Sequence, residues 1–384
     1  MELPERADVV VIGGGVMGAS SAYHLLKSGV SSVLLLEKES YFGQGATGRC
    51  AGGVRYQFAT EVNVRLSIAS LAMIDAFKSE TGQDPLYRKC GYLFVITDPA
   101  DVPTFRRNIQ MQNDLGVGTV WLEGDAVRAR LPVMRFEDAL GGSWNAADGL
   151  ADPNSIVMGY IKRMRELNGM ALTDQEVISI GVKSGHITSV TTGSGSVACG
   201  AVINAAGPWM GRIGQMVEVE IPLQPIRRQM VTTTPLPELP ADFPFVIDFS
   251  RSLYFHREGE GILTGMSNPD EKAGFDQSID EEWELIAMEA AMDRLPMLNQ
   301  AGRLAGWAGL YEVTPDAHPI FGRSPVDGFW VVGGFSGHGF MHGPIAGKLM
   351  AEFLTNGQAA TVDVSMLDLA RFKENRLIHE YNVV

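Results

Sequence analysis

Three glycines near the start of the sequence are the first residues whose spacing suggests chemistry. Gly13, Gly15 and Gly18 fall in the pattern G-x-G-x-x-G, directly after the apolar run at residues 9–12. The first glycine of this pattern permits a tight turn, the second lets a pyrophosphate approach bare backbone, and the third lets the next helix pack closely on the strand. A phosphate would then lie at the N-terminus of that helix. The pattern alone is weak evidence, because glycine-rich turns occur in many unrelated α/β proteins.

The residues around the glycines complete a βαβ unit. Residues 16–28 can form a helix, Gly29 suits its C-terminal cap, and residues 33–36 form a second apolar strand that ends on Glu37. Glu37 stands 19 residues after Gly18, since 37 − 18 = 19. A carboxylate there can accept hydrogen bonds from an adenosine ribose and would repel a 2′-phosphate. The unit therefore predicts a dinucleotide site, and the alternative is an ordinary βαβ unit with a solvated Glu37.

The elements after Glu37 must hold the rest of such a ligand. The stretch GQGATGRCAGGVR at residues 43–55 is rich in small residues and shows no strand pattern, and a helical segment follows at about 61–78. Such a stretch suits backbone that lies flat along an extended cofactor. An NAD domain would instead continue with a third strand and helix soon afterwards.

Two further turns of small residues come late in the chain. A strand at 201–204 ends in Ala-Ala-Gly after hairpin-like runs at 177–182 and 187–192. A strand at 329–332 opens into GGFSGHGFMHGPIAG, and a helix is expected at about 344–354. The N-terminal dipole of that helix could stabilise the negative charge of a reduced flavin. The three separated turns predict a cofactor domain built from distant segments, with a substrate domain inserted between them.

Composition excludes several classes of protein. The 384 residues suggest two domains, and 31 basic against 45 acidic residues give a net charge of −14, so nucleic acid is not expected as a partner. The first strand begins by about residue 8 and no apolar stretch approaches the ~20 residues of a membrane span, which predicts a cytoplasmic protein with no membrane span. Three widely spaced cysteines without a Cys-x-x-Cys pair indicate neither disulfides nor a metal site.

Six motifs in order resemble a known family. They are GGGVMG at 13–18, GATGRCAGGVR at 45–55, ADPNSIV at 151–157, NAAGPW at 204–209, TPDAHPIFG at 314–322 and GGFSGHGFMHGP at 333–344. Together they resemble the D-amino-acid oxidase (DAO) family of FAD enzymes. The sequence is most similar to sarcosine oxidase β subunits and to the β subunits of dye-linked L-proline dehydrogenases. The resemblance covers nearly the whole chain.

The resemblance implies an α/β (α+β) fold with two domains. A discontinuous Rossmann-like FAD-binding domain would use residues 1–85, 145–215 and 309–384. A mainly antiparallel β-sheet substrate domain would use residues 86–144 and 216–308. The runs at 227–233, 253–256 and 262–265 have the strand character that the second domain needs.

The resemblance also implies an activity, the oxidation of a secondary or tertiary amino acid such as sarcosine, dimethylglycine or L-proline to its imine, with hydride transfer to the flavin. Because the flavin carries the difficult step, the protein need only bind, orient and desolvate the substrate. This accords with a sequence that shows no convincing set of nucleophile, base and orienting residue. Two alternatives stay open: a 2-hydroxy-acid dehydrogenase of the same fold, and an FAD-binding electron-relay subunit of a larger complex.

Three residues are candidates for contact with substrate. Arg55 resembles the arginine that binds the substrate carboxylate in the family, and its planar fork can bind both oxygens. Tyr254 resembles a tyrosine that lines the family's pocket, and His256 would share its strand face. The alternatives are a surface ion pair for Arg55 and simple packing for the other two.

The predicted cofactor contacts follow the small-residue turns. We expect FAD, without a covalent bond to the protein, to contact Gly13, Gly15, Val16, Met17, Gly18, Glu37, Lys38, Gly45, Ala46, Thr47, Arg49, Cys50, Val177, Ala206, Gly207, Trp209, Gly309, Gly337, His338, Gly339, Phe340 and Met341. His338 is expected to contact the cofactor rather than to transfer protons.

Several positions depart from the oxidase members of the family. Gly309 stands where monomeric sarcosine oxidases carry a cysteine bound to flavin, and Leu263 and Met341 stand where oxidases carry lysines. The departures suggest a dehydrogenase that passes electrons to a partner rather than to oxygen. The resemblance to β subunits implies, as further expectations, a hetero-oligomer with other redox subunits and an FMN at a subunit interface.

Overall fold

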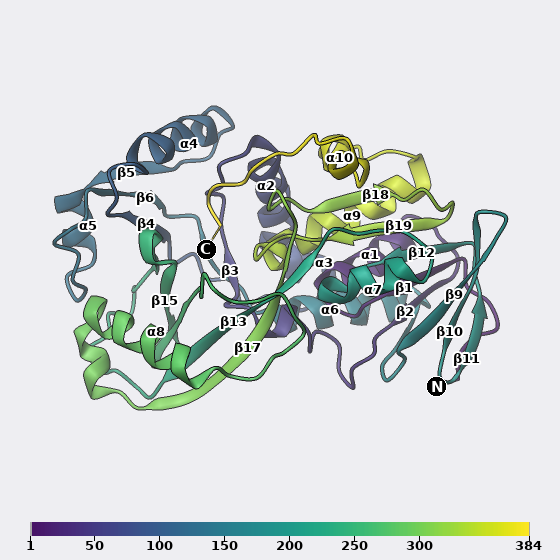
Figure 1. The fold of residues 1–384 in the computed structure, drawn as a ribbon, viewed down its shortest axis with the longest axis horizontal. Coiled ribbons are helices and arrows are strands. Elements are labelled where there is room, and N and C mark those ends of the chain that lie inside the picture. The colour runs from purple at the N-terminus through teal and green to yellow at the C-terminus, as the bar shows by residue number, and fades with distance from the viewer. Residues whose placement is uncertain (1, 384) are drawn as a thin grey trace.

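A six-stranded sheet lies at the centre of one half of the molecule, on the right in Figure 1. The structure is a computed structural model that describes residues 2–383. The strand order is β18-β19-β12-β1-β2-β8, and every neighbouring pair is parallel except β18 with β19. The strands are β1 (Val9–Ile12), β2 (Val33–Leu36), β8 (Met170–Leu172), β12 (Ala201–Asn204), β18 (Ile320–Arg323) and β19 (Phe329–Gly333).

Both faces of this sheet are covered, which explains why its strands are uninterrupted apolar runs. Val9 and Val11 of β1 join a core with the helices on one face, whereas Val10 and Ile12 join a core with a three-stranded antiparallel sheet on the other. The helices of the first face are α1 (Val16–Lys27), α2 (Glu61–Asp75), α3 (Phe77–Thr81), α6 (Pro153–Glu166) and α9 (Gly339–Asn356). The other face carries α7 (Met210–Gln215), β9 (Val177–Lys183), β10 (His186–Thr192) and β11 (Gly195–Ala198).

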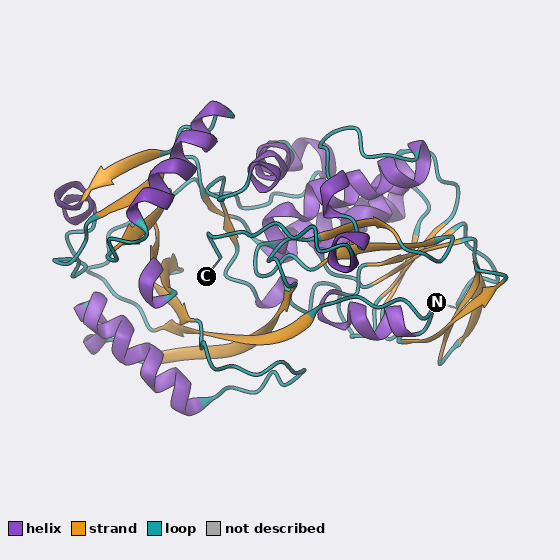
Figure 2. Cartoon of the chain, turned by 45° about the horizontal axis from the view of Figure 1, so that its top comes forward, coloured by secondary structure: helices purple, strands orange, loops and turns teal. Residues whose placement is uncertain are grey.

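The other half of the molecule contains an eight-stranded sheet. Its order is β17-β13-β16-β15-β14-β4-β6-β5, and only β14 and β4 pair in parallel. The strands are β4 (Tyr92–Ile96), β5 (Val120–Glu123), β6 (Gly141–Asn145), β13 (Gln224–Thr233), β14 (Phe245–Asp248), β15 (Leu253–Glu258), β16 (Gly261–Met266) and β17 (Arg303–Val313). This half also holds α4 (Val102–Asp114), α5 (Gly124–Arg130) and α8 (Glu281–Arg294). The long strands β13 and β17 lead back toward the first half (Figure 2).

The arrangement confirms the fold class expected from the sequence, a mixed α/β architecture with a mainly antiparallel second sheet. A short antiparallel pair, β3 (Gly53–Val54) with β7 (Gly149–Leu150), joins two distant segments, and α10 (Ala370–Lys373) follows near the end. None of the helices within residues 2–383 is both long enough and apolar enough to cross a bilayer. Cys50, Cys90 and Cys199 form no disulfide with one another within residues 2–383.

Two helices differ from the sequence expectation. The segment expected at 61–78 forms α2 and α3, because the backbone of Ala76, with ψ near −2°, turns the chain between them. The helix expected at about 344–354 is α9, which begins at Gly339 instead of Pro344. Gly343 and Gly347 lie so close to Val16 and Ser20 of α1 that tertiary packing requires helix on both sides of the proline. This packing outweighs the loss of one backbone donor at Pro344.

Candidate active site

A cavity of about 210 Å³ lies beyond the carboxyl ends of the parallel strands β1, β2 and β12. Ligands of open α/β sheets bind at this edge. Residues from all the predicted small-residue turns meet around it. The predicted cofactor residues that line it are Gly13, Gly15, Val16, Met17, Glu37, Lys38, Gly45, Ala46, Thr47, Arg49, Cys50, Val177, Ala206, Gly207, Trp209, Gly309, Gly337, Gly339 and Phe340.

The first glycine turn has the geometry that the motif requires. Gly13 has φ of +109°, and a Cβ there would lie 2.3 Å from the carbonyl oxygen of Ala205. A Cβ on Gly18 would lie 1.8 Å from the carbonyl oxygen of Gly13, so Gly18 lets α1 pack against the turn and lines no cavity itself. The N-terminus of α1, where the Val16 N–H donates to Thr47 Oγ1 at 3.1 Å, opens directly onto the cavity.

Glu37 ties the turn to the end of β2. Its Oε2 accepts a hydrogen bond from the Gly14 N–H at 2.6 Å, and its Oε1 accepts one from the Glu39 N–H at 2.9 Å. Burial, the largest effect, raises the pKa of Glu37 in spite of these two bonds. Each carboxylate oxygen keeps further acceptor capacity, so the side chain can also accept hydroxyl groups of a ribose in the cavity.

The segment around Arg49 connects this cavity with β17. Arg49 Nη1 donates to the Ala308 carbonyl at 2.8 Å, and Trp307 Nε1 donates to the Arg49 carbonyl at 3.1 Å. A Cβ on Gly309 would lie 3.1 Å from the Arg49 Cβ. Gly309 therefore lets the small-residue segment lie close against the sheet, and it offers no sulfur for a covalent link.

Glu312 is a cavity residue that the sequence analysis missed. Its Oε1 accepts a hydrogen bond from the Phe335 N–H at 3.3 Å, whereas its Oε2 is buried and finds no partner in the described part of the chain. Burial raises the pKa of Glu312 to about 7. An orphaned acceptor beside a cavity fits a ligand rich in hydroxyl groups, such as a dinucleotide with its sugar chain. Glu312 follows no recognisable motif, so only the fold reveals it.

A second cavity of about 90 Å³ adjoins the first. The two share five lining residues, Cys50, Met230, Tyr311, Gly337 and Phe340. Tyrosine rings form much of the wall of the second cavity, and each has space because it faces a glycine, with Tyr92 against Gly53, Tyr254 against Gly265 and Tyr311 against Gly337. Tyr92 and Tyr311 were not expected here, because no local pattern marks them.

Arg55 lines the second cavity and is only 6% exposed. Its Nη1 donates to the carbonyl of Gln57 and its Nη2 to that of Asn382, the latter at 2.7 Å, and its guanidinium lies 4.0 Å from the Phe58 ring centre. No ion pair to Arg55 occurs within residues 2–383. Burial lowers its pKa, but an arginine stays charged at neutral pH. A buried cation without a carboxylate is costly, so an anionic ligand would bind favourably here.

Asp148 lies behind Arg55 and is fully buried. It accepts hydrogen bonds from the Tyr56 N–H at 2.7 Å and from Gln57 Nε2 at 2.8 Å. Burial raises the pKa of Asp148 to about 7, and the bonds together with the Arg55 charge limit that rise. Asp148 thereby holds residues 56 and 57, which directly follow Arg55 in the chain.

Of the other two predicted substrate residues, one lines the second cavity and one does not. Tyr254 lines the second cavity, and burial raises its pKa. His256 lines neither cavity, and its ring stacks on Phe245 with centroids 5.1 Å apart. Burial lowers the pKa of His256 to about 4, so the imidazole is neutral at pH 7. His256 therefore supports the wall from behind.

The remaining predicted positions lie at the junction of the cavities or away from it. His338 and Met341 line the second cavity, and burial lowers the pKa of His338. Leu263 lies in a core cluster and lines neither cavity. Arg228 of β13 lines the first cavity next to Tyr311. This cation was missed from the sequence, because it follows an ordinary strand pattern.

Residues 378–383, called the strap here, run between the two halves of the molecule (Figures 1 and 2). Val383 lines the second cavity, and the Asn382 carbonyl is one of the two acceptors of Arg55. Tyr381 packs on Phe249 with ring centroids 5.6 Å apart. No sequence signal pointed to the strap, which lies more than 300 residues from Arg55.

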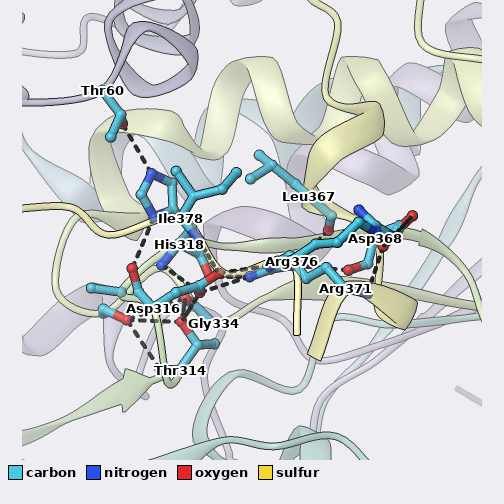
Figure 3. A network of polar contacts seen from close by, with 12 residues as sticks. Thr60, Thr314, Asp316, His318, Gly334, Leu367, Asp368, Arg371, Arg376 and Ile378 are labelled. Atoms are coloured by element: carbon cyan, nitrogen blue, oxygen red, sulfur yellow. Dashed lines mark hydrogen bonds and ion pairs between the residues drawn. The ribbon is translucent and has the colours of Figure 1, made fainter. Parts of the chain in front are cut away.

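The TPDAHPIFG motif holds the beginning of the strap (Figure 3). Arg371 donates from Nε to Asp316 Oδ2 at 2.8 Å, and both side chains are 0% exposed. The Ile378 N–H donates to the same oxygen at 3.4 Å. His318 Nε2 lies 2.9 Å from Thr60 Oγ1, just before α2. The motif is thus structural rather than part of a cavity wall.

A glycine turn at a helix N-terminus, an acidic residue at the end of β2 and a cavity at the carboxyl edge of the parallel strands define an α/β protein with a dinucleotide-type site. Comparison with known proteins supplies the family. The family model described as FAD-dependent oxidoreductase (DAO) matches residues 8–353, and the chain belongs to this family. It is therefore an FAD-dependent oxidoreductase, and the resemblance expected from the sequence is confirmed.

Curated relatives include dehydrogenases of N-methylated amino acids. The mitochondrial dimethylglycine dehydrogenase of Mus musculus is 29% identical over 392 residues, covering 97% of this chain and 45% of the relative. The mitochondrial sarcosine dehydrogenase of Mus musculus is 27% identical over 394 residues, covering 98% of this chain and 42% of the relative. The chain thus spans less than half the length of these two relatives.

Solved structures support the fold over the whole chain. L-Proline dehydrogenase from P. horikoshii matches with a TM-score of 0.91 and 32% identity, covering 98% of this chain and 100% of that one. Glycine oxidase from Geobacillus kaustophilus matches with a TM-score of 0.85 and 23% identity, covering 96% and 99%. The second likeness shows the shared fold alone.

Glu37→Ala is expected to weaken FAD binding about 10- to 100-fold, because a charge-assisted acceptor for the ribose is lost together with the bond to Gly14. Apoprotein is prepared by acid release of flavin, and FAD affinity is measured by quenching of flavin fluorescence. Glu39→Ala, which removes a neighbouring carboxylate that also lines the cavity, is the matched control. Equal affinities for all three proteins would mean that Glu37 supports the turn through Gly14 but makes no contact with the cofactor.

Proposed function

We propose that this chain oxidises a small secondary or tertiary amino acid, of the sarcosine, dimethylglycine or L-proline type, to its imine, with noncovalently bound FAD as the oxidant. One observation carries the proposal: Arg55, a buried cation with no carboxylate partner within residues 2–383, lines a small aromatic cavity that adjoins the dinucleotide cavity. The curated relatives and the proline dehydrogenase structure support the substrate class.

Arg55 would bind the carboxylate of the substrate. Two of its five N–H groups are taken by backbone carbonyls, and three are left to form the two parallel bonds that a carboxylate accepts. With one end held there, the rest of a small substrate must lie among Tyr92, Tyr254 and Tyr311. This places the reacting carbon toward the residues that the two cavities share.

The walls of the second cavity favour the reactive form of the amine. Within residues 2–383 no aspartate or glutamate lines it, so a protonated amine would lose hydration without gaining an acidic side chain as partner. Such surroundings lower the pKa of an amine and leave its nitrogen lone pair free. The tyrosine faces would still attract a residual ammonium while the substrate enters. When bound, the flavin accepts the hydride from the carbon beside the nitrogen.

The same walls restrict the choice of substrate. Among the residues that the structure describes, Arg55 is the only arginine or lysine that lines the second cavity, so a phosphorylated substrate would find too little positive charge. A volume of about 90 Å³ also favours a molecule of few heavy atoms. A 2-hydroxy acid meets both conditions, and it therefore remains the second candidate together with the relay function.

Anaerobic mixing tests the proposal. The holoenzyme is mixed with sarcosine, dimethylglycine, L-proline, hydroxyproline, glycine and 2-hydroxy acids while flavin absorbance is followed. We expect bleaching by one or more of the secondary or tertiary amino acids. Bleaching by 2-hydroxy acids alone would select the second candidate, and no bleaching by any compound would favour the relay function.

The acceptor and partners belong to the same proposal. Met341 in the second cavity, where oxidases carry a lysine, supports a dehydrogenase within a hetero-oligomer of redox subunits, whereas Arg228 could supply the charge that stabilises reduced oxygen. Reoxidation of the bleached enzyme by dye faster than by air would support the dehydrogenase. The comparisons give no support to an FMN at a subunit interface, and FAD is the cofactor that we propose.

Domain boundaries and location complete the proposal. We propose the division into residues 1–85, 145–215 and 309–384 against 86–144 and 216–308, supported by the eight-stranded sheet, most of whose residues fall in the second set. The end of β6 at residue 145 and the end of β17 at residues 309–313 extend beyond these bounds. A cytoplasmic location stays a prediction that cell fractionation tests, since relatives include mitochondrial proteins.

A further inference from the structure

Glu380 is a buried carboxylate at the centre of the strap. It is 8% exposed and accepts four hydrogen bonds. Its Oε1 accepts from the N–H groups of Ala59 at 2.6 Å and Asn382 at 3.0 Å, and its Oε2 accepts from Thr60 Oγ1 at 2.8 Å and Asn63 Nδ2 at 2.9 Å. Such complete pairing is what makes a buried charge tolerable.

These bonds attach the strap to the beginning of α2. Thr60 is the N-cap residue of α2 and makes no side-chain capping bond within the helix. The Glu380 carboxylate lies at this end, where the helix dipole favours a negative charge. Besides the bonds of the Ile378 and Glu380 N–H groups to Asp316, the Glu380 carboxylate therefore fixes the strap to α2, two positions before the strap reaches Arg55.

Asn382 carries the effect from Glu380 to Arg55. Its N–H is one of the four donors to Glu380, and its carbonyl accepts from Arg55 Nη2 at 2.7 Å. The Gln57 carbonyl accepts from Arg55 Nη1. The guanidinium is thus held between two backbone carbonyls, of which the Gln57 carbonyl belongs to its own loop and the Asn382 carbonyl to the strap.

We propose that Glu380 is a positioning residue for Arg55, because it fixes the strap whose Asn382 carbonyl orients the guanidinium toward the second cavity. The inference rests on the proposed role of Arg55 as the carboxylate anchor. If Glu380 is removed, the strap loses its attachment to α2 and Arg55 loses a fixed acceptor. The orientation of the fork must then be restored at each binding event, at a cost in affinity. The effect falls on binding rather than on the hydride step, so KM rises while kcat stays nearly constant.

The test compares two ligands of the holoenzyme that are not oxidised, acetate and its neutral analogue acetamide. Binding is followed by the change in flavin absorbance or by competition with the substrate. We expect Glu380→Ala to weaken acetate about 10- to 100-fold, the range for loss of a bond to a charged group, and to leave acetamide unchanged. Glu374→Ala, at an exposed carboxylate that pairs only with Arg376, is the matched control and is expected to bind both ligands as the wild type does.

A double-mutant cycle separates positioning from mere structural support. In the Arg55→Ala background, Glu380→Ala is expected to cost no further acetate affinity, because its effect passes through Arg55. Equal costs in both backgrounds would overturn the inference. If Glu380→Ala does not fold with FAD, Glu380→Gln replaces it, since one amide oxygen keeps half of the acceptors.

The two proposals fail in different ways. Wild-type enzyme that binds acetate no better than acetamide, or Arg55→Ala with unchanged acetate affinity, would overturn the proposed role of Arg55 and with it the inference. If Arg55→Ala loses acetate affinity as expected but Glu380→Ala binds acetate as the wild type does, only the inference about Glu380 is overturned.

Discussion

Arg55→Ala is expected to lower kcat/KM for the amino-acid substrate about 10²- to 10³-fold, equal to roughly 3–4 kcal/mol, the range for removing one partner of a buried charge pair. The loss is large because, across residues 2–383, the second cavity offers the substrate carboxylate no other arginine or lysine. Water cannot readily replace the guanidinium, since Arg55 is only 6% exposed. The measurement is steady-state kinetics with a dye acceptor, at matched FAD content.

Arg55→Lys is the informative companion of this variant. A lysine keeps the positive charge but offers a point charge instead of a planar fork, so activity should recover only in part. FAD content should stay normal in both variants, because Arg55 does not line the first cavity. Kinetics of Arg55→Ala equal to those of the wild type would exclude Arg55 as the carboxylate anchor.

The first cavity could be predicted from the sequence because its signals are local. The turn at Gly13 to Gly18, the position of Glu37 and the small residues after Asn204 each lie within a short segment that demands one backbone geometry. Gly13 has a positive φ, and there is no space for a Cβ at Gly18, so both positions need glycine. The glycines in the sequence therefore indicate the backbone geometry directly. Three such segments that end at the same sheet edge are enough to locate a ligand.

The second cavity could be predicted only in outline, because its residues come from distant segments. Arg55 and Tyr254 came from the resemblance, but Tyr92, Tyr311 and the strap meet them only through long-range packing. His256 was expected to contact substrate because it shares a strand face with Tyr254, yet the stack on Phe245 keeps it behind the wall. The alternation of side chains along a strand predicts which residues share a face of the sheet. Which of these residues reach a cavity depends on how the sheet packs.

Buried carboxylates show the same limit. Asp148, Glu312 and Glu380 look like ordinary surface residues in the sequence, since aspartate and glutamate are seldom buried. Donors from other parts of the chain converge on Asp148 and Glu380, whereas the Phe335 N–H reaches one oxygen of Glu312. A local sequence pattern cannot predict hydrogen-bond donors that lie up to 321 residues away in the chain.

Arg371→Met is expected to lower the free energy of unfolding by about 3–5 kcal/mol, because it leaves the buried Asp316 carboxylate without its cation. Arg371 donates to both oxygens of Asp316, at 2.8 and 3.0 Å, and both side chains are 0% exposed (Figure 3). Methionine fills a similar volume but offers no donor. Chemical unfolding at fixed FAD concentration measures the change, since bound cofactor also stabilises the folded state.

Arg376→Met is the matched control on the same segment. Arg376 pairs with Asp368 and Glu374, but its side chain is 44% exposed, and exposed pairs contribute at most about 1 kcal/mol. Comparable destabilisation by both substitutions would contradict the role assigned to the buried pair.

The dependence on pH adds an independent check of the Asp316–Arg371 pair. Burial alone would raise the pKa of Asp316, but the hydrogen bonds and charge of Arg371 outweigh it and hold this pKa below its ordinary value of about 3.8. A carboxyl group whose pKa is depressed on folding contributes stability that is present above the unfolded pKa and is lost as the pH falls through the folded one. The stability difference between wild type and Arg371→Met should therefore be constant near neutral pH and shrink below about pH 4. If the difference in free energy of unfolding stayed constant down to the lowest pH measured, Arg371 would stabilise the fold by packing alone. The Ile378 N–H bond to Asp316 would then be the main attachment of the strap at this point.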